Sequence, residues 1–292
     1  MNRLLAAILL IFTFSCTSQT KSDKVVLKNG DKDMLVYNAA YLPSPKKDAP
    51  WFGRSGFIHP VLSPKGKTLT TPFPSDHLHQ HAIMFAWTSG RIGNRKVDFW
   101  NSKRLEGKIE HVETVSVSDS KIVVKLRHID IKGGNQVVLN ETWEISKVDH
   151  PSLNIFDLKS TQNCVLKDGF KVAKYHYGAL CLRSISGFTA LTNEGLDRIK
   201  GNHSKPTWVA FSGQVDGEDC GIAGIQHKSN FRYPQPVRIH PKMPYFCFAP
   251  MVAGEFKLEY GKPYVSKFRF VAFDGKVNAA ELNKISTEFN KD

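Results

Sequence analysis

The residues best suited to chemistry are three histidines at alternate positions, His77, His79 and His81, in the segment SDHLHQHAIMFAW (residues 75–87). An imidazole with a pKa near 6.5 exchanges protons close to neutral pH. Asp76 directly precedes the first histidine, and a carboxylate in that place would fix the tautomer of a neighbouring ring. The segment therefore indicates acid/base or substrate-binding chemistry, in which His77 and His79 transfer protons and Asp76 orients one of them.

A metal site is a second interpretation of the same segment. On an extended strand, side chains two residues apart share a face, with Cα atoms about 6.6 Å apart. His77 and His79 would then hold one divalent metal with a third ligand from elsewhere, such as His227. The outer pair of three same-face histidines would lie about 13 Å apart, so a straight strand cannot direct all three at one ion. A third interpretation is structural, with each ring bonded to a nearby carbonyl. The sequence requires no particular cofactor.

Two further segments carry residues suited to binding a sugar. GNRKVDFWN (residues 93–101) places Asp98 and Trp100 close together, and a carboxylate beside an indole suits a ring with hydroxyls and C–H faces. A core position for Trp100 is the alternative. KYHYGALCLRS (residues 174–184) places Tyr177 and Arg183 on one face of an alternating pattern. If Arg183 is buried there, it needs an anion or several acceptors.

A third polar group follows a predicted strand in GIAGIQHKSNFRYPQP (residues 221–236). His227 stands at the end of that strand, and Asn230 and Arg232 come just after it. We expect these three residues to form the polar rim of the same pocket. His227 would join the catalytic residues, and Asn230 and Arg232 would bind substrate with Trp100, Tyr177 and Arg183.

The rest of the chain predicts the scaffold. Most apolar runs are five to nine residues long, alternate with period two and end at Gly, Pro, Asn or Asp. This pattern is typical of an all-β protein, an antiparallel β-sandwich or barrel. Residues 24–38 predict a β-hairpin around an Asn-Gly-Asp turn. NAAELNKISTEFNK (residues 278–291) predicts a C-terminal helix with Asn278 as N-cap and Leu282, Ile285 and Phe289 on one face.

Composition and charge narrow the choice of partners. The 292 residues contain 40 Lys and Arg against 27 Asp and Glu, a formal net charge of +13. The basic residues are scattered and no segment interleaves them with aromatic residues, so nucleic acid is not an expected partner. Nucleophile-elbow, dinucleotide-binding and phosphate-loop motifs are absent, which leaves acyl hydrolysis, dinucleotide and nucleotide triphosphate chemistry unsupported.

The N-terminus predicts export. Arg3 and the apolar run LLAAILLIFTF precede Ser15 and Cys16, and the run is too short to span a bilayer. We expect residues 1–16 to be a signal peptide with a lipobox cysteine, Cys16 to carry lipid, 17–25 to be a tether and 26–292 to be one β-sandwich domain. The protein would then be a lipoprotein anchored in a membrane of the periplasm or outer membrane. Ordinary cleavage nearby, with loss of Cys16, is the alternative. Pairing among Cys164, Cys181, Cys220 and Cys247 stays open.

As an ordered set, DHLHQHAIMFAW, VDFWN, HYGALCLR, WVAFSG and GIAGIQHKSNFRYPQP resemble the PmoA-like ("methane oxygenase PmoA") family of exported bacterial proteins, over about residues 30–275. The resemblance implies a supersandwich related to galactose mutarotases and a role in carbohydrate metabolism. It implies site roles for Asp76, His77, His79, Trp100, Tyr177, Arg183, His227, Asn230 and Arg232. The chain has Gln80 and His81 where the family more often has His and Arg, which weakens a three-histidine metal site.

Three hypotheses follow. The first is a carbohydrate-active enzyme that acts on a sugar or an oxidised keto-sugar by histidine acid/base chemistry, as an isomerase or epimerase, lyase or hydrolase. The second is a glycan-binding lipoprotein without catalysis. The third is a His-ligated metal protein. Membrane-embedded oxygenase chemistry is not expected, because no apolar run of about 18 residues follows the N-terminal one.

Overall fold

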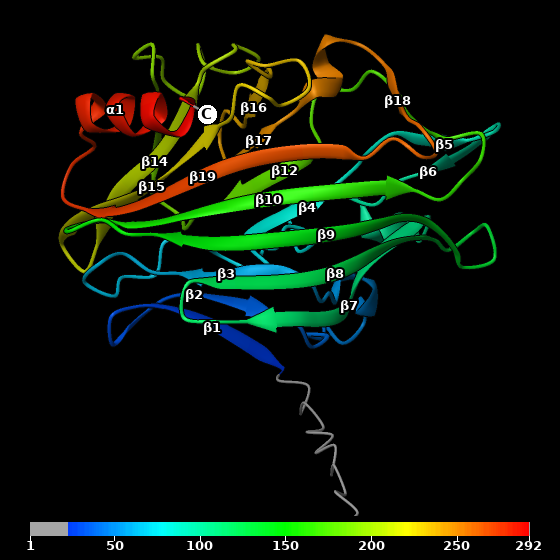
Figure 1. Cartoon of the computed structure of the whole chain (residues 1–292), viewed down its shortest axis with the longest axis horizontal. Helices are drawn as coiled ribbons and strands as arrows, with labels where there is room; N and C mark the ends of the chain where they lie inside the picture. Colours follow the sequence, from blue (N-terminus) through cyan, green and yellow to red (C-terminus); the bar gives the residue numbers. More distant parts are fainter. Residues whose placement is uncertain (1–22, 292) are drawn as a thin grey trace, which may run out of the picture.

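Alternating apolar residues build two large antiparallel sheets that lie face to face (Figure 1). The computed structural model describes residues 23–291. The predicted signal peptide 1–16, Cys16 and most of the tether 17–25 lie outside the described residues. The tether prediction is wrong at its end, because the first strand already begins at Lys24.

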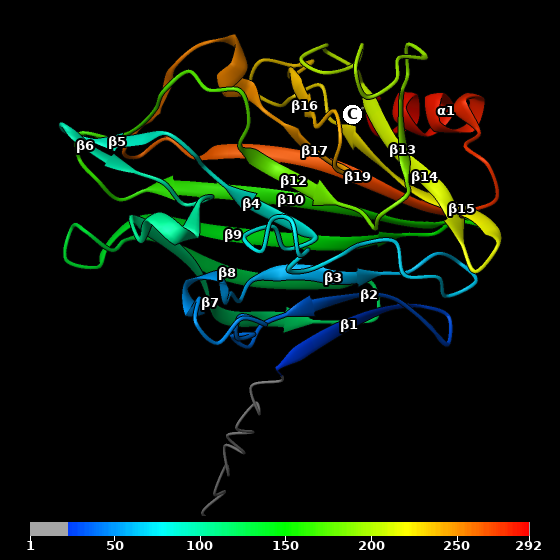
Figure 2. The same ribbon diagram turned by 180° about the vertical axis from the view of Figure 1, so that it is seen from behind.

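The first large sheet has seven strands, and its order brings distant segments together. The chain starts at one edge, and residues after 236 complete the other edge (Figure 2). In spatial order the strands are β1 (Lys24–Asn29), β2 (Lys32–Asn38), β3 (Phe57–Val61), β4 (Ile83–Ala86), β12 (Ala179–Arg183), β17 (Tyr245–Phe248) and β16 (Val237–Ile239).

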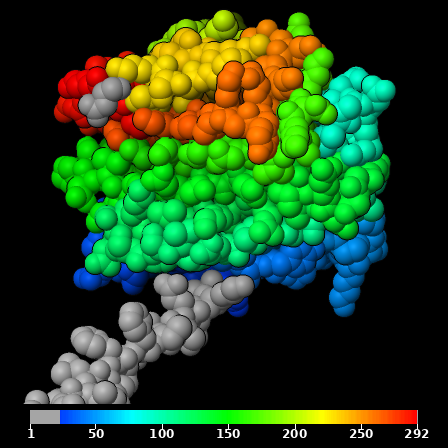
Figure 3. Space-filling view, turned by 45° about the vertical axis from the view of Figure 1, so that its right-hand side comes forward, coloured from blue at the N-terminus to red at the C-terminus, as the bar shows by residue number. Residues whose placement is uncertain are grey.

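The second large sheet has eight strands and includes the longest ones. Their side chains cover its outer surface as successive bands in Figure 3, with β19 in orange above the green and teal strands. In spatial order the strands are β13 (Thr189–Thr192), β14 (Trp208–Val215), β15 (Glu218–Gln226), β19 (Tyr264–Asp274), β10 (Asn154–Cys164), β9 (Gln136–Val148), β8 (Lys121–Asp130) and β7 (Gly107–Val117).

Short elements complete the ends of the sandwich. A four-stranded sheet contains β18 (Phe256–Leu258), β11 (Phe170–Val172), β5 (Gly90–Ile92) and β6 (Arg95–Val97). Three 3₁₀ turns are η1 (Pro50–Phe52), η2 (Ser102–Arg104) and η3 (Pro250–Ala253). The proline-rich stretch 41–76 contains only η1 and β3 as regular elements and is otherwise a long ordered loop.

The inner faces of the two large sheets meet through aromatic side chains. Phe246 of β17 stacks on Phe211 of β14, with ring centroids 5.9 Å apart, and Phe248 stacks on Phe268 of β19 at 5.3 Å. Because side chains alternate along a strand, the residues between these phenylalanines point away from the core. Tyr245 and Cys247 therefore lie on the opposite face of the seven-stranded sheet, where both are buried beneath loops.

A polar network lies within this otherwise apolar interior. The Glu141 carboxylate, fully buried, accepts hydrogen bonds from His128 Nε2 at 2.7 Å, Trp143 Nε1 at 2.7 Å, Ser160 Oγ at 2.5 Å and Gln162 Nε2 at 3.0 Å. Burial raises the pKa of Glu141, but the hydrogen bonds, that from His128 above all, outweigh it and hold the pKa below its usual value. The carboxylate is therefore a structural anion, without access to substrate.

The C-terminal helix α1 (Ala279–Phe289) covers part of the outer face of the eight-stranded sheet. The Asn278 side chain accepts from Glu281 N, as the predicted N-cap. Leu282 and Ile285 are buried against a cluster that contains Ile155, Ile225 and Val271. The prediction of an all-β antiparallel sandwich with a C-terminal helix is thus confirmed.

Two smaller expectations also have outcomes. The hairpin predicted over residues 24–38 is formed by β1 and β2.

Cys164, Cys181, Cys220 and Cys247 are all free and buried, so none of these four forms a disulfide in the described chain. No helix within residues 23–291 is long and apolar enough to cross a membrane.

Candidate functional site

The outer face of the seven-stranded sheet carries an unusual set of polar side chains. Arg183 of β12 pairs with Tyr245 of β17, and Cys247 pairs with Cys181 on one side and with Arg238 of β16 on the other. Since paired residues point to the same side of a sheet, two arginines and a tyrosine project outward from three neighbouring strands. Loops cover this face, and they bring the histidines to it.

The histidine segment is a turn, so the straight strand that its alternation suggested is wrong. His77 N donates to Pro74 O at 2.9 Å, and Gln80 N donates to His77 O at 2.9 Å. Residues 75–80 are therefore folded back on themselves, and β4 begins only at Ile83. The three imidazoles consequently occupy different surroundings.

Asp76 pairs with Arg183. Arg183 Nη2 donates to both carboxylate oxygens of Asp76 at 2.9 Å, and Nη1 donates to Gln80 Oε1 at 3.0 Å. His77 Nδ1 lies 3.8 Å from the Asp76 carboxylate, beyond hydrogen-bond distance. The expected role of Asp76 in fixing a histidine tautomer is therefore wrong in this arrangement. Asp76 neutralises the buried Arg183 and ties the turn to β12.

Three imidazoles gather above this ion pair. The rings of His77 and His79 meet edge to face with centroids 5.3 Å apart, and the ring of His240 lies 6.4 Å from that of His77. Burial lowers the pKa of His77, and it lowers those of His79 and His240 to about 4. All three rings are therefore neutral at pH 7 and able to accept a proton.

Aromatic side chains form the adjoining wall. The ring centroids of Trp100 and Tyr177 lie 5.3 Å apart, and Tyr245 lies 6.5 Å from Trp100 and 5.2 Å from His240. Trp100 is only 2% exposed, so it supports Tyr177 and does not offer an open face to a sugar as predicted. Tyr177 is partly exposed and presents the accessible aromatic surface.

The hydroxyl of Tyr177 is positioned by Asn101, whose amide nitrogen and oxygen lie 3.0 and 3.1 Å from it. Asn101 is in turn bonded to Asp98. Burial raises the pKa of Tyr177, and the phenol keeps its proton across the neutral range. Tyr177 is therefore a protonated phenol that packs on Trp100, which lines the same pocket as His79.

Asp98, expected to bind a sugar, is fully occupied within the protein. Its carboxylate accepts from the backbone nitrogens of Trp100 and Asn101 and from the side chains of Thr88, Asn101 and Arg104. The residue is 1% exposed. Asp98 thus fixes the turn that carries Trp100 and Asn101, and it has no free lone pair for a ligand.

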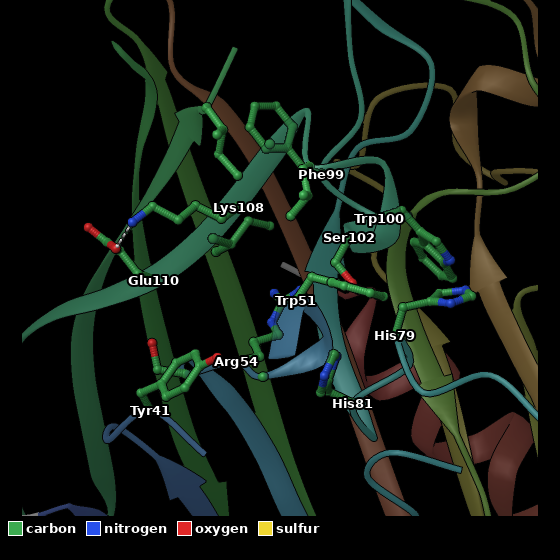
Figure 4. Close-up of a pocket in the computed structure, with 16 residues that line it drawn as sticks. Tyr41, Trp51, Arg54, His79, His81, Phe99, Trp100, Ser102, Lys108 and Glu110 are labelled. Carbon is green, nitrogen blue, oxygen red and sulfur yellow. Dashed lines mark ion pairs between the residues drawn. The ribbon is translucent and has the colours of Figure 1, made fainter. Parts of the chain in front are cut away.

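A pocket of about 250 Å³ opens beside His79 (Figure 4). Trp51 stands at its centre with Arg54 nearby, and the Lys108–Glu110 ion pair lies at its far side. Burial lowers the pKa of Arg54 to about 10. Four buried polar atoms here have no hydrogen-bond partner among the described residues, namely Trp51 Nε1, Arg54 Nε, His81 Nδ1 and Ser102 Oγ.

His81, the third histidine of the segment, has a structural position. Its Nε2 lies 2.9 Å from Phe52 O, and its ring packs against Phe57 and Phe73 at 5.5 and 4.7 Å. Burial lowers its pKa well below the usual value, which keeps the ring neutral. His81 therefore anchors η1 under the pocket and is not paired with His77 or His79.

His227 does not belong to this site, contrary to the prediction. Its ring packs on Phe289 of α1 at 4.9 Å, in a separate hollow lined by Asp157, Lys267 and Arg269. Lys267 and Arg269 flank Phe268 on β19, and because Phe268 points into the core, these two side chains point outward. His227 thus lies on the outer face of the eight-stranded sheet, with the whole sandwich between it and His77.

Asn230 and Arg232, predicted to bind substrate, hold the backbone instead. Asn230 exchanges two hydrogen bonds with the backbone of Lys267, at 2.7 and 2.8 Å. Arg232 donates to the carbonyl oxygens of Pro250, Gly254 and Glu255. Both side chains fasten the loop after β15 to its neighbours, which corrects the expectation of a shared polar rim.

The metal hypothesis loses its expected ligand set in this arrangement. Within residues 23–291, no three His, Cys, Asp or Glu side chains are grouped as a metal site requires. His77 and His79 meet edge to face, and His227, the suggested third ligand, lies on the other sheet.

The structure adds residues that the sequence did not single out as a set. His240, Tyr245 and Arg238 stand on or beside β16 and β17, next to His77 and Trp100. Their signal was present in RIH (residues 238–240), where two polar residues interrupt an apolar strand. Nothing in the spacing, however, shows that β17 pairs with β12, more than 60 residues earlier in the chain.

The chain has few recorded similarities to known proteins. No curated protein matches the chain. Among solved structures, heparan sulfate lyase HepC from Pedobacter heparinus aligns with a TM-score of 0.41 and 10% identity, over 84% of this chain. The chain spans about a third of that enzyme, since 33% of its length is covered. A likeness at this level assigns no activity.

A family model does match, over residues 24–287. These bounds begin at the first residue of β1 and end within α1, so the match includes both large sheets and the site between the histidine turn and β16. The chain therefore belongs to the family of unknown function DUF6807.

Proposed function

We propose that this protein is a carbohydrate-active enzyme in which His79, assisted by His77, accepts a proton from a bound sugar. The observation that carries this proposal is the pair of neutral, partly exposed imidazoles whose centroids lie 5.3 Å apart beside the aromatic wall of Tyr177 and Trp100. An imidazole kept neutral by burial is free to accept a proton at pH 7, although its lowered pKa makes it a weaker base than a solvated histidine.

The surrounding residues supply the remaining parts of such a reaction. Tyr177 keeps its proton and donates it to Asn101 Oδ1 in the free protein, and it would redirect this proton to an oxygen of a bound sugar. The accessible ring of Tyr177 suits the C–H face of a pyranose. Arg183, tied to Asp76, keeps the turn that carries both histidines against β12. Isomerisation, epimerisation and elimination share this proton abstraction as their first step.

Deuterium incorporation gives a direct test. The wild-type protein would be incubated in D₂O with panels of reducing sugars, keto-sugars and oligosaccharides, and exchange at carbon and product formation followed by NMR. We expect exchange or turnover with at least one sugar, reduced roughly 100-fold or more in His79→Ala, with binding retained. His150→Ala, on the loop between β9 and β10, is the matched control and keeps wild-type rates.

Two outcomes would contradict the enzyme proposal. If wild type and His79→Ala bind the same sugars and neither exchanges a proton nor turns over any, the protein is a glycan-binding module. If His79→Ala retains wild-type turnover, the base lies elsewhere.

Export and anchoring form part of the same proposal. The N-terminal run and Cys16 support a lipoprotein of the periplasm or outer membrane, and the resemblance to the PmoA-like family agrees with export and sugar metabolism. A membrane-held enzyme would meet carbohydrate outside the cytoplasm.

A further inference from the structure

We propose that the sugar taken by this site carries a carboxylate, as a uronic acid does, and that Arg238 binds that carboxylate. This inference rests on the proposed function and names its substrate class. Arg238 lies on β16, on the outer face that also carries Tyr245 and Arg183.

Arg238 lacks the anionic partner that four other arginines of the described chain have. The guanidinium groups of Arg95, Arg104, Arg183 and Arg269 each pair with an aspartate. Arg238 has no carboxylate within ion-pair distance in residues 23–291; its Nη1 donates to Asn202 Oδ1 at 3.1 Å. Arg238 also donates to the Tyr245 hydroxyl, and its Nε is buried, so the remaining Nη hydrogens are the donors left for a ligand.

The burial of Arg238 makes this lack of an anion informative. The side chain is only partly exposed, and its Nε is buried without a partner among the described residues. Water therefore solvates this charge incompletely, and a partly desolvated cation attracts an anion more strongly than an exposed lysine would. A carboxylate accepts two parallel hydrogen bonds from a guanidinium, which gives orientation as well as affinity.

The side chains that face Arg238 carry no compensating negative charge. The other ionisable side chains that face it are His176, His240 and Tyr245. Both imidazoles have lowered pKa values, from burial first and from Arg238 second, and stay neutral. Asp76, the nearest acidic group of the histidine turn, is engaged by Arg183. An incoming anion thus meets a local positive charge.

A carboxylate also fits the proposed chemistry. When a guanidinium neutralises a sugar carboxylate, the C–H bond next to it becomes easier to deprotonate. His240 joins Arg238 to the base, because its ring packs on Tyr245 at 5.2 Å and lies 6.4 Å from His77. A series of ring contacts, from Tyr245 through His240 and His77 to His79, therefore connects the strands that carry Arg238 with the proposed proton acceptors.

The test compares sugars that differ only in charge. Oligogalacturonides and alginate oligosaccharides would be titrated beside the same oligosaccharides after reduction of their carboxyl groups to alcohols. We expect the wild type to bind at least one acidic set tenfold or more tightly than its reduced counterpart. Arg238→Gln should bring that ratio to within about twofold, and Arg238→Lys should keep part of it. Arg127→Gln, an equal charge change at an exposed position of β8, keeps the full ratio.

Each contrary result has a distinct meaning. The wild type alone can overturn the inference. It does so if it binds acidic and reduced oligosaccharides equally, or if it binds neither acidic set. A ratio that persists in a folded Arg238→Gln also overturns it. If a neutral sugar undergoes His79-dependent exchange in any of these cases, the proposed function stands while the acidic substrate class falls.

Discussion

His79 and His81 stand two residues apart, yet their surroundings give them different roles. His81 is 2% exposed, lies 2.9 Å from Phe52 O and packs between two phenylalanines, so its ring belongs to the core. Both residues border the pocket, but His79 is partly exposed and faces His77. The difference arises because residues 75–80 fold as a turn and rotate successive side chains out of a common face.

The pH dependence of activity should report the state of His79. Burial lowers its pKa to about 4, so the base stays unprotonated well below neutrality. We expect kcat/KM for sugar turnover or deuterium exchange to hold from pH 7 to about pH 5 and to fall below that. The raised pKa of Tyr177 predicts no loss of the proton donor before about pH 10. An acidic limb at pH 6.5, the value of a solvated imidazole, would show that His79 is not the base.

Part of the site was predictable from residue types, and part was not. His77, His79, Tyr177 and Arg183 do come together, because a polar side chain in an apolar run has to meet other polar groups. His227, Asn230 and Arg232 carry the same chemistry, but their hydrogen bonds and ring contacts lie within the scaffold. The sequence could not distinguish a side chain that binds a ligand from one that binds a backbone carbonyl.

Among the elements, β9 shows how one strand serves two environments. Glu141 points into the sandwich and accepts hydrogen bonds from His128, Trp143 and Ser160. Glu144, three residues later, points outward and pairs with Lys121 and Lys159. Alternation predicts that the two residues face opposite sides, but it cannot show which side is covered by a second sheet.

Loss of the Glu141 charge should destabilise the fold strongly. Glu141→Gln keeps the volume but replaces an acceptor oxygen by an NH₂ group among several donors. We expect a loss of about 3 kcal/mol in the free energy of unfolding, measured by urea denaturation at pH 7. Glu144→Gln is the control and should cost less than about 1 kcal/mol, because an exposed ion pair contributes little. Equal effects of the two substitutions would contradict the assigned structural role.

Local strand and helix patterns were largely predictable, whereas the order of strands was not. The hairpin at residues 24–38 and the helix capped by Asn278 depend on neighbours within a few residues. The pairing of β4 with β12 and of β12 with β17 joins segments separated by about 60 to 100 residues. That order depends on which faces can be buried together, and it is this order that assembles the site.

For the whole molecule, the order of the seven-stranded sheet relates the N-terminus to the site. The sheet begins with β1 at one edge and ends with β16 at the other, and Figures 1 and 2 show these edges at opposite ends of the sheet. The residues of the proposed site lie on β12, β17 and β16 and on the loops beside them. The described chain thus begins at the opposite edge of the sheet from β16.

Substitution of Cys16 tests the proposed anchor. We expect the expressed full-length protein to take up labelled fatty acid and to sediment with membranes, and Cys16→Ala to lose the label and become soluble. Cys164→Ala, at a buried position of the fold, is the control and should keep the label. If the wild-type protein takes up no labelled fatty acid and appears in the soluble fraction, the proposed anchor is refuted. The proposed sugar chemistry does not depend on this result.

The position of β1 at the rim also decides how large a glycan could reach an anchored enzyme. Neighbouring strands lie about 4.8 Å apart, so the four steps from β1 to β12 place Arg183 and its histidine turn roughly 19 Å from the edge where the chain enters. If Cys16 anchors the protein, its tether joins the fold at this edge and not beside β16. A long polysaccharide would then reach the site from the β16 side without passing the point where the tether joins.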